Sequence, residues 1–196
     1  MPKIRTFIAV EIPDETKDRI AQVQSELKKY GERISWVKSG NIHLTLKFLG
    51  DVEEGQIKAL GRGMESAAKK AAPFTLAFRN LGVFPNLRRA RVVWVGANES
   101  SGILIKLADS LDSEMSLLGF PKESRKFSPH LTIGRIKARP AEKFLKRIEH
   151  YEFEGGEALI NNVCLMKSDL RPTGAIYTAL KQIHLVSSSR LWGVNS

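Results

Sequence analysis

The chain has 196 residues, enough for one compact domain, and its 42% hydrophobic and 27% charged residues are ordinary for a globular protein. A net charge of +10 predicts a surface that attracts nucleic acid, an acidic membrane or a phosphorylated small molecule, without choosing among them. The single cysteine, Cys164, excludes an intramolecular disulfide framework and a thiolate zinc site. With no signal peptide and no apolar stretch near the roughly 20 residues of a membrane helix, we expect a cytoplasmic protein that does not bind membranes.

Apolar periodicity and turn residues predict alternating strands and helices in the first half of the chain. Proline and acidic residues favour the start of the first helix, and Gly31 favours its end. The predicted order is strand, helix, short strand, strand, helix and strand, over residues 6–10, 13–30, 34–37, 41–50, 53–70 and 74–83.

The second half is predicted to repeat this order. Ser100 or Ser101 is expected to cap its long helix, because a side-chain oxygen can accept a free backbone N–H there, and Gly119 is expected to end it. The predicted order is strand, helix, strand, short helix and two strands. These begin near Arg91, Ser101, His130, Pro140, Ala158 and Ala175, and the last two strands run over 158–167 and 175–186.

A short motif occurs twice, as His43-Leu44-Thr45-Leu46 and as His130-Leu131-Thr132-Ile133. In a strand, side chains at i and i+2 share one face and lie roughly 6.5–7 Å apart. Each copy therefore directs an imidazole and a hydroxyl to one side of its strand and buries two aliphatic side chains on the other. Two such strands facing each other would form an acid/base pair.

The spacing of the two motifs predicts an internal duplication. One His-x-Thr-x segment could belong to any half-buried strand, but the copies lie 87 residues apart (130 − 43), and strands starting at Arg5 and Arg91 lie 86 apart (91 − 5). We therefore expect a single α+β domain over residues 1–196 with two pseudo-symmetric lobes. Each lobe would hold a mainly antiparallel sheet with helices on its outer face, and the histidines would meet in the cleft between the lobes.

Two imidazoles and two hydroxyls at one site favour general acid–base chemistry. An ordinary histidine pKa of about 6.5 lets one neutral imidazole accept a proton while a protonated partner donates one. The threonine hydroxyls can donate to a developing oxyanion, and they lack the adjacent base that would make them nucleophiles. No dense group of acidic residues accompanies the histidines, so a two-metal hydrolase is disfavoured and no metal or other cofactor is expected.

The chain resembles the 2H phosphoesterase superfamily, and within it the RNA 2′,3′-cyclic phosphodiesterases, also called 2′–5′ RNA ligases. The resemblance covers nearly the whole chain. It rests on the paired motifs, on Arg5-Thr6-Phe7-Ile8-Ala9 and on Phe127-Ser128-Pro129-His130-Leu131-Thr132-Ile133-Gly134-Arg135. It implies metal-independent hydrolysis of a terminal 2′,3′-cyclic phosphate to a 2′-phosphate.

The resemblance also implies a role for each motif residue. His43 would be the proton donor to the leaving 3′-oxygen, and His130 would be the proton acceptor that activates water. Thr45 and Thr132 would bind the phosphate. The motifs are near-identical, so the sequence by itself does not say which histidine is the acid.

Three further residues are candidates for substrate binding. Strand alternation places Lys47 on the face of His43, where it could reach phosphate, although a solvated lysine at a strand end is the simpler interpretation. Alternation directs Arg135 away from His130, but the resemblance implies a substrate-binding arginine here, and a bulge at Gly134 would reconcile the two. Phe7 is most simply a core residue, and the resemblance makes it a candidate for base stacking.

The expected partner is RNA with 2′,3′-cyclic phosphate ends, such as tRNA fragments, or a related nucleotide, and the protein is expected to be a monomer. Three basic clusters could hold an RNA backbone if they surround the cleft. These are Arg88, Arg89 and Arg91; Lys122, Arg125 and Lys126; and Arg135, Lys137 and Arg139. Three alternatives stay open. One is 2′–5′ ligation, with an RNA 5′-hydroxyl replacing water. The second is an RNA- or nucleotide-binding module that keeps the fold without catalysis, and the third is a structural RNA-binding protein that uses only its charge.

Overall fold

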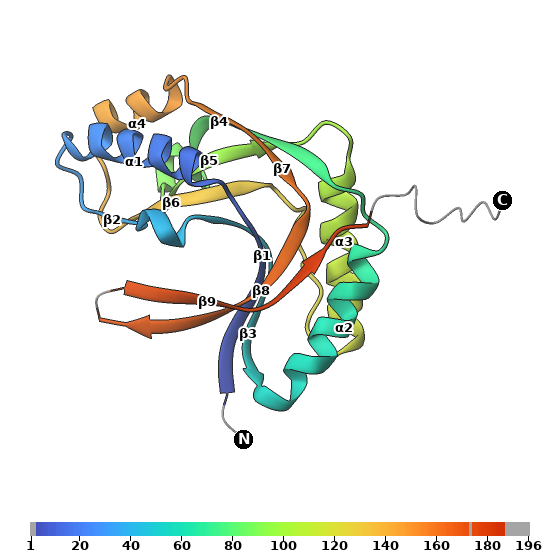
Figure 1. The fold of residues 1–196 in the computed structure, drawn as a ribbon. Coiled ribbons are helices and arrows are strands. Elements are labelled where there is room, and N and C mark those ends of the chain that lie inside the picture. The colour runs from blue at the N-terminus through green and yellow to red at the C-terminus, as the bar shows by residue number, and fades with distance from the viewer. Residues whose placement is uncertain (1–2, 173, 187–196) are drawn as a thin grey trace.

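The structure, a computed structural model, describes residues 3–172 and 174–186. Within these residues, nine strands join into one curled sheet with four longer helices, and the pairs between strands are antiparallel (Figure 1). The elements are β1 (Lys3–Glu11), α1 (Asp14–Lys28), β2 (Ile34–Trp36), β3 (His43–Glu53), α2 (Ile57–Ala68), β4 (Phe74–Phe84), β5 (Val92–Asn98), α3 (Ile103–Leu117), β6 (His130–Ile136), α4 (Glu142–Glu149), β7 (Glu154–Ile160), β8 (Asn162–Arg171) and β9 (Gly174–His184).

The order of the strands is pseudo-symmetric about the centre of the sheet. The order is β7-β4-β5-β6-β3-β1-β8-β9, and β2 pairs with β6 beside this path. The motif strands β3 and β6 are therefore central neighbours, each followed outward by the first strand of its own half, β1 or β5. The predicted α+β class with mainly antiparallel strands is confirmed, with the difference that both lobes share one continuous sheet. The internal duplication stays a prediction.

The outer strands of the two halves are exchanged. β4 follows the first motif along the chain but pairs with β5, and β8 of the second half pairs with β1. The single strand predicted over 158–167 is therefore wrong. The chain instead forms two strands that are separated at Asn161. β7 pairs with β4 in one half of the sheet, and β8 pairs with β1 in the other half. Asn161 and Asn162 mark the break in the sequence, between the apolar residues of β7 and those of β8.

The core lies between the helices and one face of the sheet. Leu44 and Leu131 of the motif strands point into this core and are fully buried, as is Ile20 of α1. Figure 1 shows α1 beside α4 and α2 beside α3, at opposite ends of the curled sheet. None of the described helices is both long and apolar enough to cross a bilayer.

The same irregularity interrupts both motif strands. Ala9 pairs with Thr45 while Ile8 pairs with Lys47, so Leu46 has no opposite residue. In the same way Trp94 pairs with Thr132 and Val93 with Gly134, which leaves out Ile133. An extra residue of this kind is a β-bulge, and it reverses the alternation of side chains beyond it. The bulge expected at Gly134 thus lies one residue earlier, at Ile133, and β3 holds an equivalent one at Leu46.

The long helix of the second half is capped by a carboxylate. Of the two expected caps, Ser101 accepts the backbone N–H of Ile103, the first residue of α3, through its Oγ at 3.4 Å. The Glu99 carboxylate, which was not expected as a cap, accepts the backbone N–H groups of Ser101 and Leu104 at 2.5 and 3.2 Å. A negative charge at this end of a helix is favourable, because the free N–H groups give the end a partial positive charge.

Candidate active site

The central strand pair brings the two motifs together. Leu44 of β3 lies opposite Leu131 of β6. In an antiparallel pair, opposite residues share a face, so the flanking polar residues His43, Thr45, His130 and Thr132 all project to the face away from the core. We call this the motif face. The site predicted from the two motifs is thus assembled at the centre of the sheet.

The two histidine rings are held in the same way. The Nδ1–H of His43 donates to the carbonyl oxygen of Asn41 at 2.8 Å, and the Nδ1–H of His130 donates to that of Ser128 at 2.7 Å. Since a carbonyl oxygen can only accept, each Nδ1 carries a hydrogen and each Nε2 is free to gain or lose a proton. Both imidazoles are therefore oriented for proton transfer at Nε2.

The side chains around His43 are aromatic or apolar and shield much of its ring from solvent. Its ring stacks on Phe7, with centroids 4.7 Å apart and planes at 25°, and Tyr177 of β9 meets it edge-on at 5.1 Å. Phe7, Ala9, Cys164 and Met166 form a small apolar cluster below it. Burial lowers the pKa of His43 to about 4, against the opposing effect of its bond to the Asn41 carbonyl. His43 is therefore neutral near pH 7 in the free protein.

The surroundings of His130 are different. Phe84 meets its ring edge-on at 4.8 Å, and Phe84 in turn packs against Trp94 at 5.2 Å. Trp94 lies opposite Thr132, and its indole N–H is buried without a hydrogen-bond partner among the described residues. Aromatic side chains thus contact each histidine, but no described residue stacks on His130 as Phe7 stacks on His43.

Lys47 does not lie on the motif face. The bulge at Leu46 turns its side chain toward the helices, where it is buried and forms an ion pair with Asp112 of α3 at 2.5 Å. The prediction that Lys47 shares the face of His43 is therefore wrong, and so is the simpler interpretation of a solvated lysine. Strand alternation failed here because the bulge adds one residue between Thr45 and Lys47.

The same bulges bring two other side chains to the motif face. Arg135 lies opposite Val92, two residues from Trp94, so it shares the face of Thr132, as the predicted bulge required. Phe48 lies opposite Phe7 and is 64% exposed. The sequence interpretation missed Phe48, although the 87-residue offset that relates the motifs also relates Phe48 to Arg135.

Phe7 is a core residue beneath the site. Its ring is 3% exposed and lies against His43, Phe48 and Tyr177, so no open face is left for a base. The interpretation of Phe7 as a core residue is confirmed. Its ring offers no exposed face on which a base could stack, as the resemblance had implied. Cys164 is also buried in the apolar cluster, as predicted, and burial raises the pKa of its thiol to about 12, so it stays protonated.

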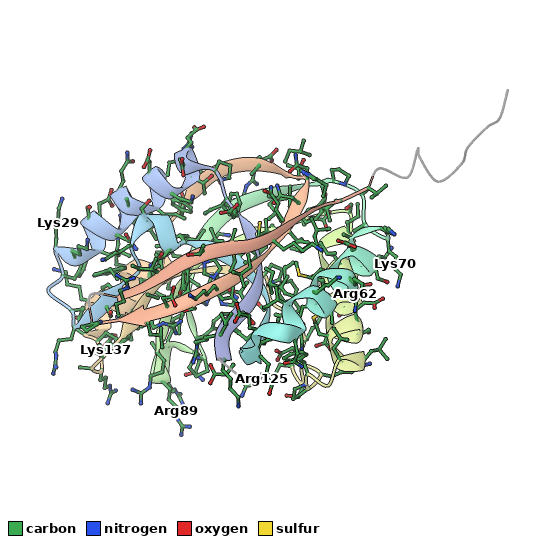
Figure 2. The ribbon with its side chains drawn as sticks, turned by 60° about the horizontal axis from the view of Figure 1, so that its bottom comes forward. Lys29, Arg62, Lys70, Arg89, Arg125 and Lys137 are labelled. Carbon is green, nitrogen blue, oxygen red and sulfur yellow. The ribbon has the colours of Figure 1, made fainter. Side chains whose placement is uncertain are left out.

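The predicted basic clusters are all on the surface. Their arginines and lysines are exposed, and Figure 2 shows Lys137, Arg89 and Arg125 spaced along one margin of the molecule. Lys29, at the end of α1, lies away from Arg125 in this view. The described residues contain no group of three or more His, Cys, Asp or Glu side chains that could hold a metal ion.

Comparison with known proteins identifies the family. The family described as LigT like Phosphoesterase matches the chain over residues 10–94 and again over 95–177. The chain belongs to this family. The resemblance to the 2H phosphoesterases is thereby confirmed, and this LigT-like protein is an enzyme, a phosphoesterase.

Relatives and solved structures agree with the assignment. RNA 2′,3′-cyclic phosphodiesterases of Methanothermobacter thermautotrophicus and Methanocaldococcus jannaschii are 37% and 38% identical to the LigT-like protein. The matches cover 93% and 91% of this chain and 100% and 99% of the relatives. TT0787 of Thermus thermophilus has a TM-score of 0.80 at 29% identity, over 93% of this chain and 98% of the other. E. coli LigT complexed with 3′-AMP has a TM-score of 0.75 at 29% identity, over 95% and 100%.

Proposed function

We propose that this LigT-like phosphoesterase hydrolyses 2′,3′-cyclic phosphate ends of RNA to 2′-phosphates. The observation that carries the proposal is the pair of imidazoles, each held through Nδ1 by a backbone carbonyl with Nε2 free, on paired strands beside two threonines. The names of the relatives from M. thermautotrophicus and M. jannaschii support the substrate. The net charge of +10 suits an RNA ligand.

In the proposed reaction the two histidines work on opposite sides of the phosphorus. Nε2 of His130 takes a proton from water, whose oxygen forms a bond to phosphorus. The bond from phosphorus to the 3′-oxygen breaks in line, and Nε2–H of His43 gives that oxygen its proton. Thr45 and Thr132 donate hydrogen bonds to the non-bridging oxygens, where negative charge builds up.

The proposed role of His43 as proton donor depends on the substrate. The pKa of its imidazole is about 4 in the free protein, so the donor is not charged before substrate arrives. An anionic phosphate beside Nε2 favours the imidazolium and raises this pKa. Binding of the substrate would therefore favour protonation of His43, and the leaving oxygen would later receive that proton.

Two side chains on the motif face complete the proposed substrate site. Arg135 would bind the nucleotide or its phosphate, as predicted. Phe48, exposed at the equivalent position of the first half, would take the base-stacking role expected of Phe7. Phe48→Ala should raise KM for a cyclic-phosphate dinucleotide more than it lowers kcat.

The central test is hydrolysis of an oligonucleotide ending in a 2′,3′-cyclic phosphate in excess EDTA. We expect a 2′-phosphate product and little effect of the chelator, because imidazoles carry out the proton transfers. Loss of activity in EDTA that a divalent ion restores would overturn the acid–base mechanism. Adding an RNA with a 5′-hydroxyl tests the second activity, 2′–5′ ligation, because its hydroxyl can replace water in the same site.

A sulfur substitution tests the two roles. A substrate with sulfur in place of the bridging 3′-oxygen has a good leaving group and needs little protonation. This analogue should restore much of the activity of His43→Ala and hardly any of His130→Ala. Restoration of His130→Ala instead would exchange the roles.

A further inference from the structure

A buried ion pair ties the first motif strand to the segment that leads into the second motif. Nζ of Lys47 donates to Oδ1 of Asp112 at 2.5 Å and to the carbonyl oxygen of Pro121 at 2.8 Å. The same Asp112 oxygen accepts the backbone N–H of Glu123 at 3.2 Å. The side chains of Lys47 and Asp112 are 1% and 20% exposed. Lysine is rarely buried to this extent unless it is paired, so the contact is specific.

The segment over 121–129 has few other attachments. It joins α3 to His130 and carries the basic residues Lys122, Arg125 and Lys126. In the described part of the chain, the hydrogen bonds of residues 121–129 lie at the two ends of the segment. At one end are the contacts of Pro121 and Glu123 just given; at the other, the Ser128 carbonyl accepts from His130 and the Pro129 carbonyl accepts the backbone N–H of Ala97 at 3.3 Å. Between them Phe127 packs against the core. The ion pair therefore fixes one end of a segment whose other end orients a predicted catalytic ring.

The equivalent place in the first half is held without charges. There β2 pairs with β6, and Gln24 of α1 donates to the carbonyl oxygens of Val37 and Ile133, both at 2.8 Å. Gly134 occupies the position equivalent to Lys47. A Cβ there would lie 2.8 Å from the Ile34 side chain, so β2 fills the space that Lys47 fills on the other side. In the second half no strand plays the part of β2 among the described residues, and the ion pair takes its place.

We propose that Lys47 and Asp112 form a latch that positions the 121–129 segment and, through the Ser128 carbonyl, the imidazole of His130. The latch acts on catalysis without contacting substrate, and its effect on turnover rests on the function proposed above for His130. Lys47 lies only two residues beyond Thr45 along β3. The latch therefore connects the basic segment, and with it the second histidine, to the strand that carries the first motif.

The test replaces the ion pair by apolar side chains of similar size, in the variant Lys47→Met/Asp112→Leu. Such replacements often leave stability unchanged or increased, so the fold should persist while the bonds to Pro121 and Glu123 are lost. We expect kcat for the cyclic-phosphate oligonucleotide to fall about 10²-fold, the scale of a displaced catalytic group. We also expect faster amide exchange at Glu123 and nitrogen NMR shifts showing that His130 no longer keeps its hydrogen on Nδ1.

A neighbouring pair on α3 provides the matched control. Glu114, whose side chain is 19% exposed, pairs with Lys70 of the turn after α2 at 3.3 Å. Lys70→Met/Glu114→Leu should leave kcat and the His130 signals unchanged. Lys47→Arg, which keeps the charge and the donors, should recover most of the activity.

Each outcome decides the proposal. A stable Lys47→Met/Asp112→Leu variant with wild-type kcat and unchanged His130 signals would overturn it. If that variant unfolds, Lys47→Met takes its place, because Asp112 can then be hydrated. If wild-type protein does not open cyclic phosphates, the proposed function fails, yet the amide exchange and His130 signals still decide the latch.

Discussion

The two halves of the candidate active site share a motif and a backbone contact but differ in what surrounds the histidine. His43 is stacked on Phe7 and flanked by Tyr177, and its pKa is lowered to about 4. Among the described aromatic side chains, His130 meets that of Phe84, edge-on. The backbone bond to Nδ1 is nearly the same on both sides, at 2.8 and 2.7 Å. The motif strand thus sets the direction of each imidazole, whereas burial by side chains of neighbouring strands lowers the pKa of His43.

This difference gives a near-symmetric site two unlike histidines. A duplicated motif alone would produce two identical groups, and acid–base catalysis requires one to donate while the other accepts. The apolar surroundings of His43 are formed by β1, β8 and β9, which contribute Phe7, Met166 and Tyr177. Changes in these side chains are therefore the direct way to alter the division of roles.

The largest effects should come from removing either imidazole. His43→Ala and His130→Ala should each lower kcat by about 10²–10⁴-fold, the usual contribution of one acid or base. The double variant should be far less than multiplicatively worse, because the two groups act in one step. Steady-state hydrolysis of the cyclic-phosphate oligonucleotide measures all three. A histidine variant with near-wild-type activity would remove that residue from the mechanism.

Smaller losses are expected at the threonines. Thr45→Ala and Thr132→Ala each remove one donor to the developing charge, which typically costs about 10²–10³-fold in kcat. Thr45→Ser and Thr132→Ser keep the hydroxyl and serve as controls that should retain most activity. Equal losses at the two positions would show that phosphate binding is symmetric even though proton transfer is not. No loss at one position would assign phosphate binding to the other half.

The lowered pKa of His43 predicts an acid-dependent loss of stability. Its folded pKa of about 4 lies below the ordinary 6.5, so between these values the unfolded chain binds the extra proton. The free energy of unfolding should therefore fall as pH drops below 6.5, by about 2 kcal/mol at pH 5. Urea unfolding at pH 7 and pH 5 measures this. His43→Gln should abolish this contribution and His130→Gln should not, while an unchanged pH dependence in His43→Gln would contradict the burial argument.

The smallest effects concern charges outside the site. RNA affinity should fall with rising salt as bound phosphates release counterions. Reversing Arg125 and Lys126, in the segment before the second motif, should weaken binding about tenfold and reduce the dependence on salt. The matched pair Lys28 and Lys29, at the end of α1, should have little effect. Fluorescence anisotropy at several salt concentrations separates the two, and equal effects would indicate a diffuse field with no defined RNA path.

The sequence by itself determined the motif strands, the family, and the order of helices and strands except at 158–167, where one predicted strand is two. These depend on local patterns, because alternation at i and i+2 follows from strand geometry and helix ends follow from neighbouring residues. A bulge near Gly134 was expected only because the family resemblance implies a substrate-binding arginine at Arg135; strand alternation alone did not predict it. The His43, Thr45, His130 and Thr132 group came from repetition of one local pattern.

Only the tertiary structure decided which face Lys47, Phe48 and Phe7 present. The bulge in β3 is fixed by pairing with β1, and the partner of Lys47 lies on α3, 65 residues along the chain. Tyr177, which encloses His43, lies on a strand exchanged into the first lobe from the far end of the chain. Proton affinity depends on which nonlocal side chains exclude water from an imidazole, and no local pattern records that.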